Sequence, residues 1–320
     1  MRNAPPEPEL LTDGSEPMGA VLRELDLVAQ TSLTVLILGP SGSGKELAAR
    51  ELHRRSGRSG PLVPVNCAAL AEGALESELF GHVRGAFTGA DRDRPGALVS
   101  ASGGTVFLDE VADLSARTQA MLLRVLQESE IRPLGSDRWR PVNLRFVAAT
   151  NQPLEEMVRT RLYREDLLHR LQGSVLVTPA LAERGHEFHY LVPRLVERIS
   201  LALGRNGPPL EPGLCEALAA QSWPGNVRQL LHCLERALLR CGKGPLGSEH
   251  FPELAKAPGI PLPWQEATLA FQRRHLLESL GRRGFHAAET ARDLGLSRTA
   301  LYATARRLGV DLAQERRRKG

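Results

Sequence analysis

The segment GPSGSGKE, residues 39–46, follows the apolar run TVLIL at 34–38 and opens a stretch of helical character at 46–54. It fits the pattern GxxxxGK, in which glycines let backbone N–H groups wrap around phosphates and the lysine neutralises their charge. The N-terminus of the following helix favours the same anion. The order strand, loop, helix predicts a phosphate-binding loop formed by Gly39, Pro40, Ser41, Gly42, Ser43, Gly44, Lys45 and Glu46. The alternative is a glycine-rich connector, and Glu46 stands where Ser or Thr commonly helps to hold Mg²⁺.

Short apolar runs rich in β-branched residues recur along the chain around this loop. They are residues 34–38, 62–66, 105–109, 144–148 and 175–178. Near-continuous apolar character over so few residues is typical of a strand that is buried on both faces. Helical stretches separate the runs, and strands that alternate with helices indicate βαβ units. The sequence therefore predicts the α/β class, with a mostly parallel five-stranded sheet that carries the phosphate-binding loop.

The third apolar run, TVFLD at 105–109, brings two acids to its carboxyl end, Asp109 and Glu110. This is the Walker B arrangement of phosphoryl-transfer enzymes. We expect Asp109 to hold Mg²⁺, directly or through water, and Glu110 to polarise the attacking water. An acidic pair at the end of a surface strand is the alternative, but the phosphate-binding loop earlier in the chain favours the catalytic interpretation. The expected cofactors are therefore ATP and Mg²⁺.

The remainder of the chain divides by composition. Residues 1–11 resemble a loose tail, and 12–181 carry the alternating strands and helices. Residues 182–241 show only helical periodicity, which predicts a helical lid subdomain. Residues 242–263 are dense in Gly and Pro, which predicts a linker. Residues 264–320 form a helical, Arg-rich C-terminal domain.

Charge is concentrated at one end of the chain. The 320 residues carry a net charge of +4, but the last 60 hold 12 Lys or Arg against 6 Asp or Glu, and the preceding 260 are net −2. A basic excess confined to one end indicates a nucleic-acid partner, with a solvated basic tail as the alternative. Only four residues are Lys, so the presence of Lys45 in an Arg-rich chain favours a specific role for it.

Composition also excludes several classes of protein. With 42% hydrophobic and 24% charged residues, the chain is neither disordered throughout, collagen-like nor a disulfide scaffold. The four cysteines form no CxxC pair, and His186 and His189 lack further ligands, so two surface histidines are favoured over a metal site. No apolar run approaches the ~20 residues that span a bilayer, and the N-terminus has no signal-peptide pattern. We expect a cytoplasmic protein with reduced thiols and no membrane partner.

Specific motifs identify a family. The segment GAFTGA at 85–90, preceded by ELFGH at 78–82, is similar to the signature loop of the sigma-54-dependent transcriptional activators, the bacterial enhancer-binding proteins among the AAA+ ATPases. The resemblance runs from about Thr12 to the C-terminus. Further matching segments are VNCA at 65–68, GGTVFLDE at 103–110, LLRVLQE at 122–128, AATN at 148–151, RED at 164–166 and WPGNVRQL at 223–230. Glu46 fits as well, because the family normally has GKE there.

This resemblance implies roles for residues that reach the nucleotide within one subunit. Asn66 matches the residue that pairs with the catalytic Glu110 and couples nucleotide state to the loops. Asn151 matches the first sensor, which reads the γ-phosphate, and Arg228 matches the second sensor, on the lid. The alternatives are that both asparagines merely cap loops and that Arg228 is a solvated charge.

The resemblance also implies an oligomer. Arg164 and Arg170 match the arginine fingers that each subunit donates to the ATP of its neighbour. Fingers supplied in trans require a ring, which in this family is usually a hexamer. A solvated surface charge is the alternative for either residue.

The signature loop is expected to contact sigma-54. Its glycines permit a sharp protruding turn, and its tip presents an aromatic ring and a hydroxyl. The six residues are Gly85, Ala86, Phe87, Thr88, Gly89 and Ala90. A second loop, near 134–140, lies where the family has an assisting loop. The chain departs from the family at Pro40, where Glu is usual, at Ala182, which replaces an Arg, and over 185–188, which lack the usual acidic stretch.

The basic C-terminal end has the pattern of a DNA-reading unit. An amphipathic helix at 265–280 precedes a helix at 287–294, a turn at 295–297 and a second helix at 298–308, which indicates a helix-turn-helix. It resembles the Fis-type domain of the family, although residues 303–305 lack a basic run that is common there. Leu294, Leu296 and Leu301 would form its core, and Ser297 would cap the second helix. The residues expected to meet double-stranded DNA are Ser297, Arg298, Thr299, Tyr302, Arg306 and Arg307, and the tail at 316–319 either adds phosphate contacts or is disordered.

Two functions remain open. The first is an ATP-hydrolysing activator that binds upstream DNA, assembles as a ring and opens promoters held by the sigma-54 RNA polymerase holoenzyme. The second is a DNA-binding regulator that uses the ring as a nucleotide-gated switch without sigma-54, and the intact GAFTGA disfavours it. A protein-remodelling ATPase outside transcription is disfavoured by the C-terminal helices. Few residues precede the ATPase domain, so we expect control by a separate regulatory protein or by expression level.

Overall fold

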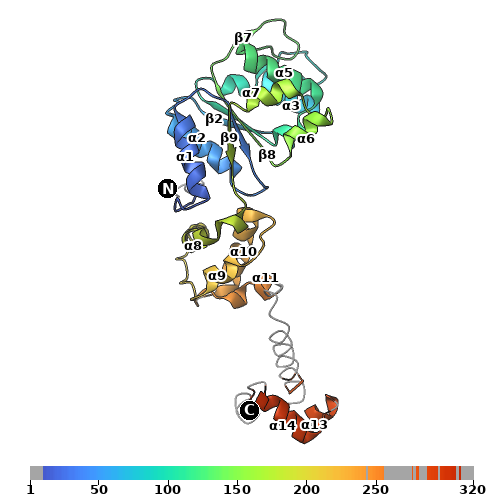
Figure 1. Ribbon diagram of the computed structural model, residues 1–320. Helices are drawn as coiled ribbons and strands as arrows, with labels where there is room; N and C mark the ends of the chain where they lie inside the picture. The colour runs from blue at the N-terminus through green and yellow to red at the C-terminus, as the bar shows by residue number, and fades with distance from the viewer. Residues whose placement is uncertain are drawn as a thin grey trace. The chain divides into compact units, whose positions relative to one another are not determined.

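The computed structural model describes residues 10–242, 244–255, 276, 279–280, 287–294, 296–307 and 310. The chain divides into two units, Met1–Ala255 and Lys256–Gly320 (Figure 1). Most of the helix expected at 265–280 and all of the tail at 316–319 lie outside the described residues. Within the described residues, no helix is long and apolar enough to cross a membrane.

A five-stranded parallel sheet forms the centre of the first unit, in the order β2-β5-β8-β1-β9. Its strands are β1 (Val35–Leu38), β2 (Leu62–Asn66), β5 (Thr105–Asp109), β8 (Arg145–Thr150) and β9 (Ser174–Val177). Every pairing among them is parallel. The α/β class and the five strands predicted from the apolar runs are confirmed.

Helices cover both faces of this sheet, which explains the continuous apolar runs (Figure 1). On one face Val35 and Ile37 pack with α1 (Met18–Ala29) and α2 (Lys45–Ser56). On the other face Leu36 packs in a second cluster with five helices. These are α3 (Glu72–Phe80), α4 (Ala97–Ser100), α5 (Ala116–Glu128), α6 (Leu154–Arg159) and α7 (Glu165–Leu171). The two edge strands are the exceptions, because Val177 of β9 is 61% exposed and Pro64 of β2 is exposed as well.

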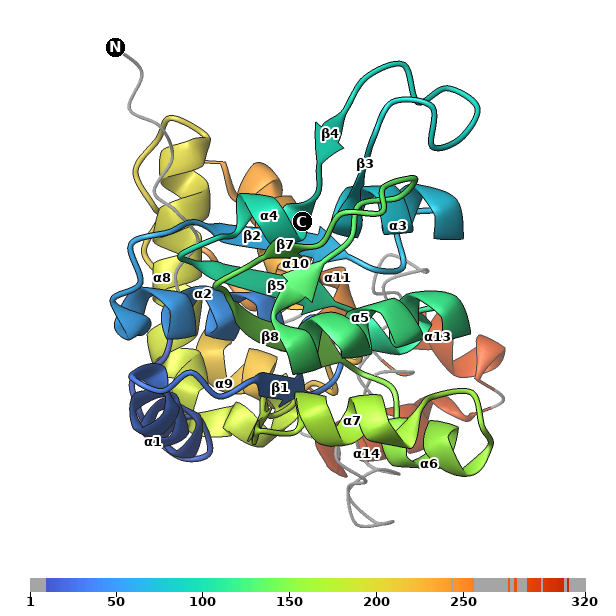
Figure 2. The ribbon, with the colours of Figure 1, turned by 90° about the horizontal axis from the view of Figure 1, so that it is seen from above.

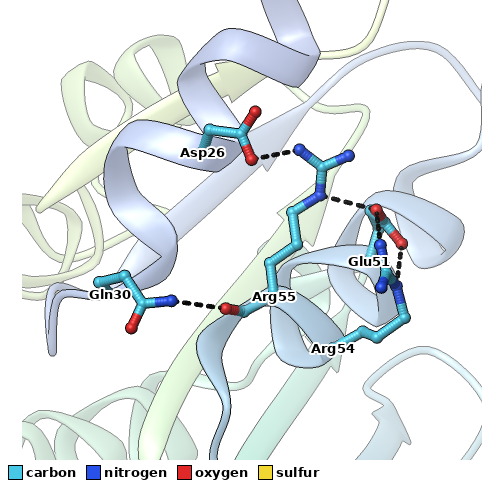
Figure 3. Close-up of polar contacts among 5 residues, drawn as sticks. All are labelled: Asp26, Gln30, Glu51, Arg54 and Arg55. Carbon is cyan, nitrogen blue, oxygen red and sulfur yellow. Dashed lines mark hydrogen bonds and ion pairs between the residues drawn. The ribbon is translucent and has the colours of Figure 1, made fainter.

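Polar contacts hold α1 against α2 (Figure 3). Arg55 of α2 donates to Asp26 of α1, and Gln30 Nε2 donates to the Arg55 carbonyl at 2.8 Å. Glu51 accepts from Arg54 and Arg55, and these guanidinium groups lower its pKa to about 2. The contacts fix the helix that begins at the phosphate-binding loop.

A buried arginine ties the same region to the middle of the sheet. The guanidinium of Arg145, on β8, donates to the carbonyls of Ala29 and Val28 at 2.8 Å each, at the C-terminus of α1. Burial lowers the pKa of Arg145 to about 10. Carbonyls at a helix C-terminus carry partial negative charge, so they stabilise a cation that has no carboxylate beside it.

The helical lid follows β9 directly. Its segments are the 3-10 turn Leu181–Glu187, α8 (Phe188–Ala202), α9 (Leu214–Ala219), α10 (Asn226–Cys241), the 3-10 turn Ser248–His250 and α11 (Pro252–Ala255). They share one apolar cluster, which includes Leu246 and Phe251, both buried. The lid therefore extends past residue 241, into a segment that the Gly and Pro content had assigned to a linker.

A buried ion pair joins the lid to the start of the described chain. Arg184 and Glu187 pair inside the lid with side chains 2% and 1% exposed. Thr12 donates to Glu187, and Arg184 Nη2 donates to the Leu11 carbonyl at 3.2 Å. Residues 11 and 12 are thereby held against the lid.

Two short antiparallel pairs carry the loops that leave the core. The first joins β3 (Gly81–His82) to β4 (Arg94–Pro95), and the second joins β6 (Glu130–Ile131) to β7 (Arg140–Pro141). Figure 2 shows the β3–β4 loop extending away from the sheet with the β6–β7 loop beside its base.

In the second unit the described residues include α13 (Ala287–Asp293) and α14 (Arg298–Arg307). Leu301 and Ala305 of α14 are buried in a cluster with Ala291, Leu276 and Leu280. Ser297 Oγ accepts from the Ala300 N–H at 3.1 Å, so the predicted cap of α14 is confirmed. Leu296 was expected in this core but is 36% exposed, because it lies in the turn between the helices.

Candidate functional site

The phosphate-binding loop connects β1 to α2 as predicted. Lys45 is buried, and its Nζ donates to the carbonyls of Gly39 at 3.0 Å and Pro40 at 3.4 Å. Burial lowers the pKa of Lys45, while the nearby charges of Glu110 and Asp109 raise it. The ammonium group of Lys45 is therefore partly desolvated, and its hydrogen-bond acceptors are neutral carbonyls. A cation in this environment is suited to bind an anionic ligand.

Neighbouring strands bring the other predicted residues to the same edge of the sheet. Asn66 ends β2, Asp109 ends β5 beside it in register, and Asn151 follows β8. β8 pairs with β1, which leads into the phosphate-binding loop. Because the carboxyl ends of parallel strands meet at one edge, a ligand placed at this edge is within reach of several strands.

The two acids after β5 differ in environment. Burial raises the pKa of Asp109, and the charge of Lys45 opposes this rise. Glu110 has a φ of +51°, in the left-handed region, and its Oε2 is buried with no hydrogen-bond partner in the described part of the chain. A strained residue with an unsatisfied carboxylate oxygen is typical of a catalytic position.

The contacts of the two asparagines, Asn66 and Asn151, do not distinguish a catalytic role from a structural one. Asn66 Oδ1 accepts from the Ala68 N–H at 3.0 Å, which is the loop-capping contact. No hydrogen bond joins Asn66 to Glu110 among the residues described. Asn151 is exposed directly after β8. Both lie at the predicted edge of the sheet, and within the described residues neither side chain forms a hydrogen bond with another predicted site residue.

The lid reaches the phosphate-binding loop through α10. Arg228 Nη1 donates to Ser41 Oγ at 3.3 Å, so the lid arginine predicted as a sensor meets the loop. The Val227 N–H donates to the Gly42 carbonyl at 3.1 Å. A Cβ on Gly42 would lie 2.5 Å from the Gly225 carbonyl, so this glycine is needed for the approach of the lid.

Asn226 is a residue of this site that sequence reasoning missed. Its Nδ2 donates to the Ser41 carbonyl and its Oδ1 accepts from the Leu181 N–H, both at 2.8 Å. It adopts a φ of +52°, which Asn tolerates better than most residues. The segment WPGN contained a partial signal, because Gly and Asn are turn residues and Asn tolerates left-handed backbone.

The remaining residues of the loop have contacts of their own. Ser43 is buried and its Oγ lies 2.7 Å from Thr178 Oγ1, just after β9. Glu46 points to the surface, where it pairs with Arg50 at 2.8 Å across one turn of α2. Glu46 is therefore engaged by an arginine of its own helix.

The two predicted arginine fingers lie at the two ends of α7: Arg164 is the N-cap residue and Arg170 is in the last turn. Arg164 is exposed and donates to both oxygens of Asp166, at 3.0 and 2.8 Å. Arg170 is exposed in the last turn of the helix. Within the described residues neither forms a hydrogen bond or ion pair with residues 39–46, so neither is engaged at the site of its own subunit.

The GAFTGA loop forms the tip between β3 and β4 (Figure 2). Gly85 and Gly89 have φ of +82° and +97°, and the Gly85 N–H donates to the Ala90 carbonyl at 2.9 Å, which closes the turn. Phe87 is 45% exposed, and its ring meets the His82 ring edge-on at 4.9 Å. His82 Nδ1 in turn lies 2.7 Å from Ser77 Oγ.

The loop at 134–140 is joined to the base of this tip. The Val83 N–H donates to the Leu134 carbonyl at 3.0 Å, and the Leu134 N–H donates to the Gly81 carbonyl at 2.9 Å. The expected assisting loop therefore lies beside the GAFTGA loop.

The donor set fits a nucleotide with Mg²⁺. The buried lysine, the glycine-lined loop and the unsatisfied Glu110 oxygen suit a polyphosphate and a water molecule, and Asp109 suits a cation. No group of three or more His, Cys, Asp or Glu residues that could hold a metal occurs in the described ranges, His186 and His189 included. Mg²⁺ is commonly held by one or two carboxylates together with phosphate oxygens, so a single Asp is sufficient.

The parallel sheet, the phosphate-binding loop, the acidic pair and the contacting lid together define a P-loop ATPase of the AAA+ class. Comparison with known families narrows this class. Residues 11–177 match the sigma-54 interaction domain and residues 182–259 match the AAA+ ATPase lid domain. The chain belongs to the family of proteins that carry the sigma-54 interaction domain.

Individual relatives agree with this assignment. The nitric oxide reductase transcription regulator NorR2 of Cupriavidus necator is 43% identical over 92% of this chain and 62% of its own length. The regulatory protein LuxO of Vibrio cholerae is 40% identical over 94% of this chain and 61% of its own. The crystal structure of NtrX from Brucella abortus in complex with ADP superposes with a TM-score of 0.72 at 34% identity, covering 94% of this chain and 70% of that one. The chain thus spans about three fifths of the length of these curated relatives.

Proposed function

We propose that this protein is a transcription activator that uses ATP hydrolysis to convert closed promoter complexes of the sigma-54 RNA polymerase holoenzyme into open ones. The observation that carries the proposal is an intact GAFTGA loop on the same core as the phosphate-binding loop and the acidic pair Asp109 and Glu110. Membership of the sigma-54 interaction family supports it.

ATP would bind along residues 39–46, with Lys45 against the β- and γ-phosphates and Arg228 and Asn226 closing the lid over them. Mg²⁺ bound with the nucleotide would be held by Asp109 and would neutralise charge on the phosphates. Glu110 would accept a hydrogen bond from the attacking water and orient it toward the γ-phosphate. Asn66 and Asn151, at the same edge, would link Glu110 and the γ-phosphate to the loops. The complex of NtrX with ADP supports nucleotide binding here.

The proposal includes assembly into a ring, with a hexamer as the expected form. Arg164 and Arg170 are exposed and have no contact with residues 39–46 of their own subunit in the described structure. A ring would bring them to the neighbouring ATP, where a guanidinium stabilises the charge of the transferring phosphoryl group. Arg164 would then give up its ion pair with Asp166 and bind the phosphoryl group of the neighbouring ATP.

Residues 85–90 would be the part that contacts sigma-54 and transmits movement. Phe87 and Thr88 lie at the tip of a turn whose base is hydrogen-bonded to the 134–140 loop. Movement of either loop is therefore coupled to the other.

The second unit would bind double-stranded DNA upstream of the promoter. The capped α14 and its contact with α13 support a helix-turn-helix, in which the second helix enters the major groove. Ser297, Arg298, Thr299, Arg306 and Arg307 lie on α14 or its cap, as does the exposed Tyr302. Their contacts with DNA remain part of the proposal.

The experiment that tests this function compares Thr88→Ala with a control, Thr160→Ala, an exposed threonine outside the loop. We expect Thr88→Ala to keep ATP hydrolysis but lose open-complex formation, measured by permanganate reactivity of promoter DNA with sigma-54 polymerase. Thr160→Ala should behave as wild type. Promoter regulation that is unchanged in Thr88→Ala would instead support the nucleotide-gated regulator that acts without sigma-54.

A further inference from the structure

A groove lies between α5 and the β6–β7 loop, and the proposed function assigns no role to most of the residues that line it. Its volume is about 310 Å³. Phe80 and Val125 are buried at its wall. The full lining is Phe80, Arg117, Met121, Arg124, Val125, Arg132, Pro133, Leu134, Gly135 and Trp139. We refer to it as the Trp139 groove.

The Trp139 groove is cationic. Three of its ten lining residues are Arg and none is Asp or Glu. Arg117 pairs with Glu76 at 3.2 Å. Arg124 and Arg132 are exposed and have no acidic partner among the residues that the structure describes. Two guanidinium groups with free donors in one concave site favour an anion with several oxygens, above all a phosphate.

An exposed aromatic ring lies in the same groove. Trp139 is 40% exposed, and the Arg132 guanidinium lies 5.8 Å from the centre of its ring. A large exposed indole beside unpaired arginines is the combination that single-stranded nucleic acid uses, because bases stack on the ring while cations hold the backbone. Bases of an intact duplex are already stacked on one another and leave no face for the indole.

The groove continues toward the GAFTGA loop. A second cavity of about 690 Å³ shares Arg117, Leu134 and Gly135 with it and is lined further by Phe87, Arg94, Glu76 and Glu78. Arg94 pairs with Glu78 at 2.7 Å, as Arg117 does with Glu76, so a chain of nucleotides that leaves the Trp139 groove past Leu134 would meet the exposed ring of Phe87 and no unpaired arginine among the described residues of that lining.

We propose that the Trp139 groove binds single-stranded DNA, with an unpaired base stacked on Trp139 and the adjoining phosphates on Arg124 and Arg132. This site is separate from the upstream DNA contact proposed for the second unit, and it binds without ATP or sigma-54. An acidic peptide is the competing ligand; it would satisfy the arginines but would leave the indole without a stacking partner.

Photo-crosslinking in the full chain tests this site, because it reports where the DNA lies. The probe is a single-stranded oligonucleotide of about 12 nucleotides with 5-iododeoxyuridine, and crosslinked peptides are identified by mass spectrometry. We expect a crosslink at Trp139 without nucleotide or polymerase. Trp139→Ala should abolish it, and Trp139→Phe, which keeps a stacking face, should retain DNA crosslinking at that position.

Charge variants test the phosphate contacts. In Arg124→Ala/Arg132→Ala the apparent Kd for the Trp139 crosslink should rise at least about 5-fold, and its salt dependence should fall by about 1.4 in log–log slope, at about 0.7 per contact. The matched control Arg194→Ala/Arg198→Ala removes two charges from the lid and should change neither. Crosslinks confined to residues 256–320 would overturn the proposal, as would a double variant equal to its control. Protection of the groove by an oligoglutamate that the oligonucleotide fails to displace would overturn it in favour of a peptide.

Discussion

Glu110 combines a left-handed backbone with a buried carboxylate oxygen that has no partner among the described residues. Backbone strain and an unsatisfied acceptor both reduce stability, so their occurrence at one residue beside Asp109 argues that this geometry serves chemistry. The sequence predicted the identity of this residue from its place after a buried strand. It held no signal for the φ angle, because left-handed backbone is predicted reliably only for Gly and Asn.

The first prediction concerns Glu110→Gln. The amide keeps the size of the side chain but accepts a proton poorly, so ATP hydrolysis should fall by about 10²- to 10⁴-fold. ATP binding should stay within a few-fold of wild type. Phosphate release and binding of a fluorescent ATP analogue measure the two effects. Hydrolysis close to the wild-type rate would show that Glu110 is not the residue that activates water.

A second prediction concerns the pH dependence of stability at Asp109. Burial raises the pKa of this carboxyl, so folding favours its neutral form. The stabilising effect is complete below the unfolded pKa, whose ordinary value is 3.8, and is lost as pH rises through the higher folded pKa. At pH 7.5 Asp109→Asn should therefore raise the thermal midpoint of the nucleotide-free protein by a few degrees, because it removes a buried charge.

The difference in thermal midpoint between Asp109→Asn and the wild-type protein should become smaller as the pH falls toward 4. Differential scanning fluorimetry over a pH series, without nucleotide or Mg²⁺, measures it. Asp137→Asn, at an exposed carboxyl of the β6–β7 loop, is the control and should leave the midpoint unchanged. A midpoint that falls at neutral pH in Asp109→Asn would mean that the attraction to Lys45 outweighs burial.

At the scale of elements, the loop between β3 and β4 combines an exposed tip with a specific resting contact. The edge-on contact between Phe87 and His82, with Ser77 beside His82, holds the ring back toward the core. Such aromatic pairs contribute about 0.5–1.5 kcal/mol beyond their burial. The third prediction follows: His82→Ala should strengthen nucleotide-free binding of sigma-54 by about 2- to 12-fold, since less free energy is needed to release Phe87.

The test is to measure the affinity of the nucleotide-free wild-type and His82→Ala proteins for labelled sigma-54. His189→Ala, an exposed lid histidine, is the matched control and should have no effect. Binding that weakens in His82→Ala would show that His82 presents Phe87 to its partner and does not restrain it.

The same scale shows why some elements were predictable and others were not. Five strands followed from runs such as 105–109, because a strand buried on both faces must be apolar throughout. The C-terminal end of the lid could not be predicted from the sequence. Leu246 and Phe251 are single apolar residues in a Gly- and Pro-rich segment, and they are buried only because they pack against the rest of the lid. The hydrogen bonds of Asn226 to Ser41 and Leu181 and the lining of the Trp139 groove join distant segments, so a local pattern could indicate the left-handed turn at Asn226 but not these contacts.

At the scale of the whole molecule, the proposed activator has three working parts: a nucleotide site with its lid, a loop that contacts sigma-54, and a DNA-reading unit. Because α10 contacts the phosphate-binding loop directly, a change at bound phosphates would reach the lid through Ser41 and Gly42. Under the proposed function, Arg164 and Arg170 would act on the ATP of a neighbouring subunit, so assembly would be a condition of hydrolysis.

The most direct test is open-complex formation on a sigma-54 promoter, reconstituted from purified polymerase and the full chain. With ATP, wild-type protein should open the promoter. With a non-hydrolysable analogue it should not, and Lys45→Ala should fail with ATP because the phosphates lose their buried cation. Promoter opening by Lys45→Ala, or by wild type with the analogue, would contradict the claim that hydrolysis at this site drives the reaction.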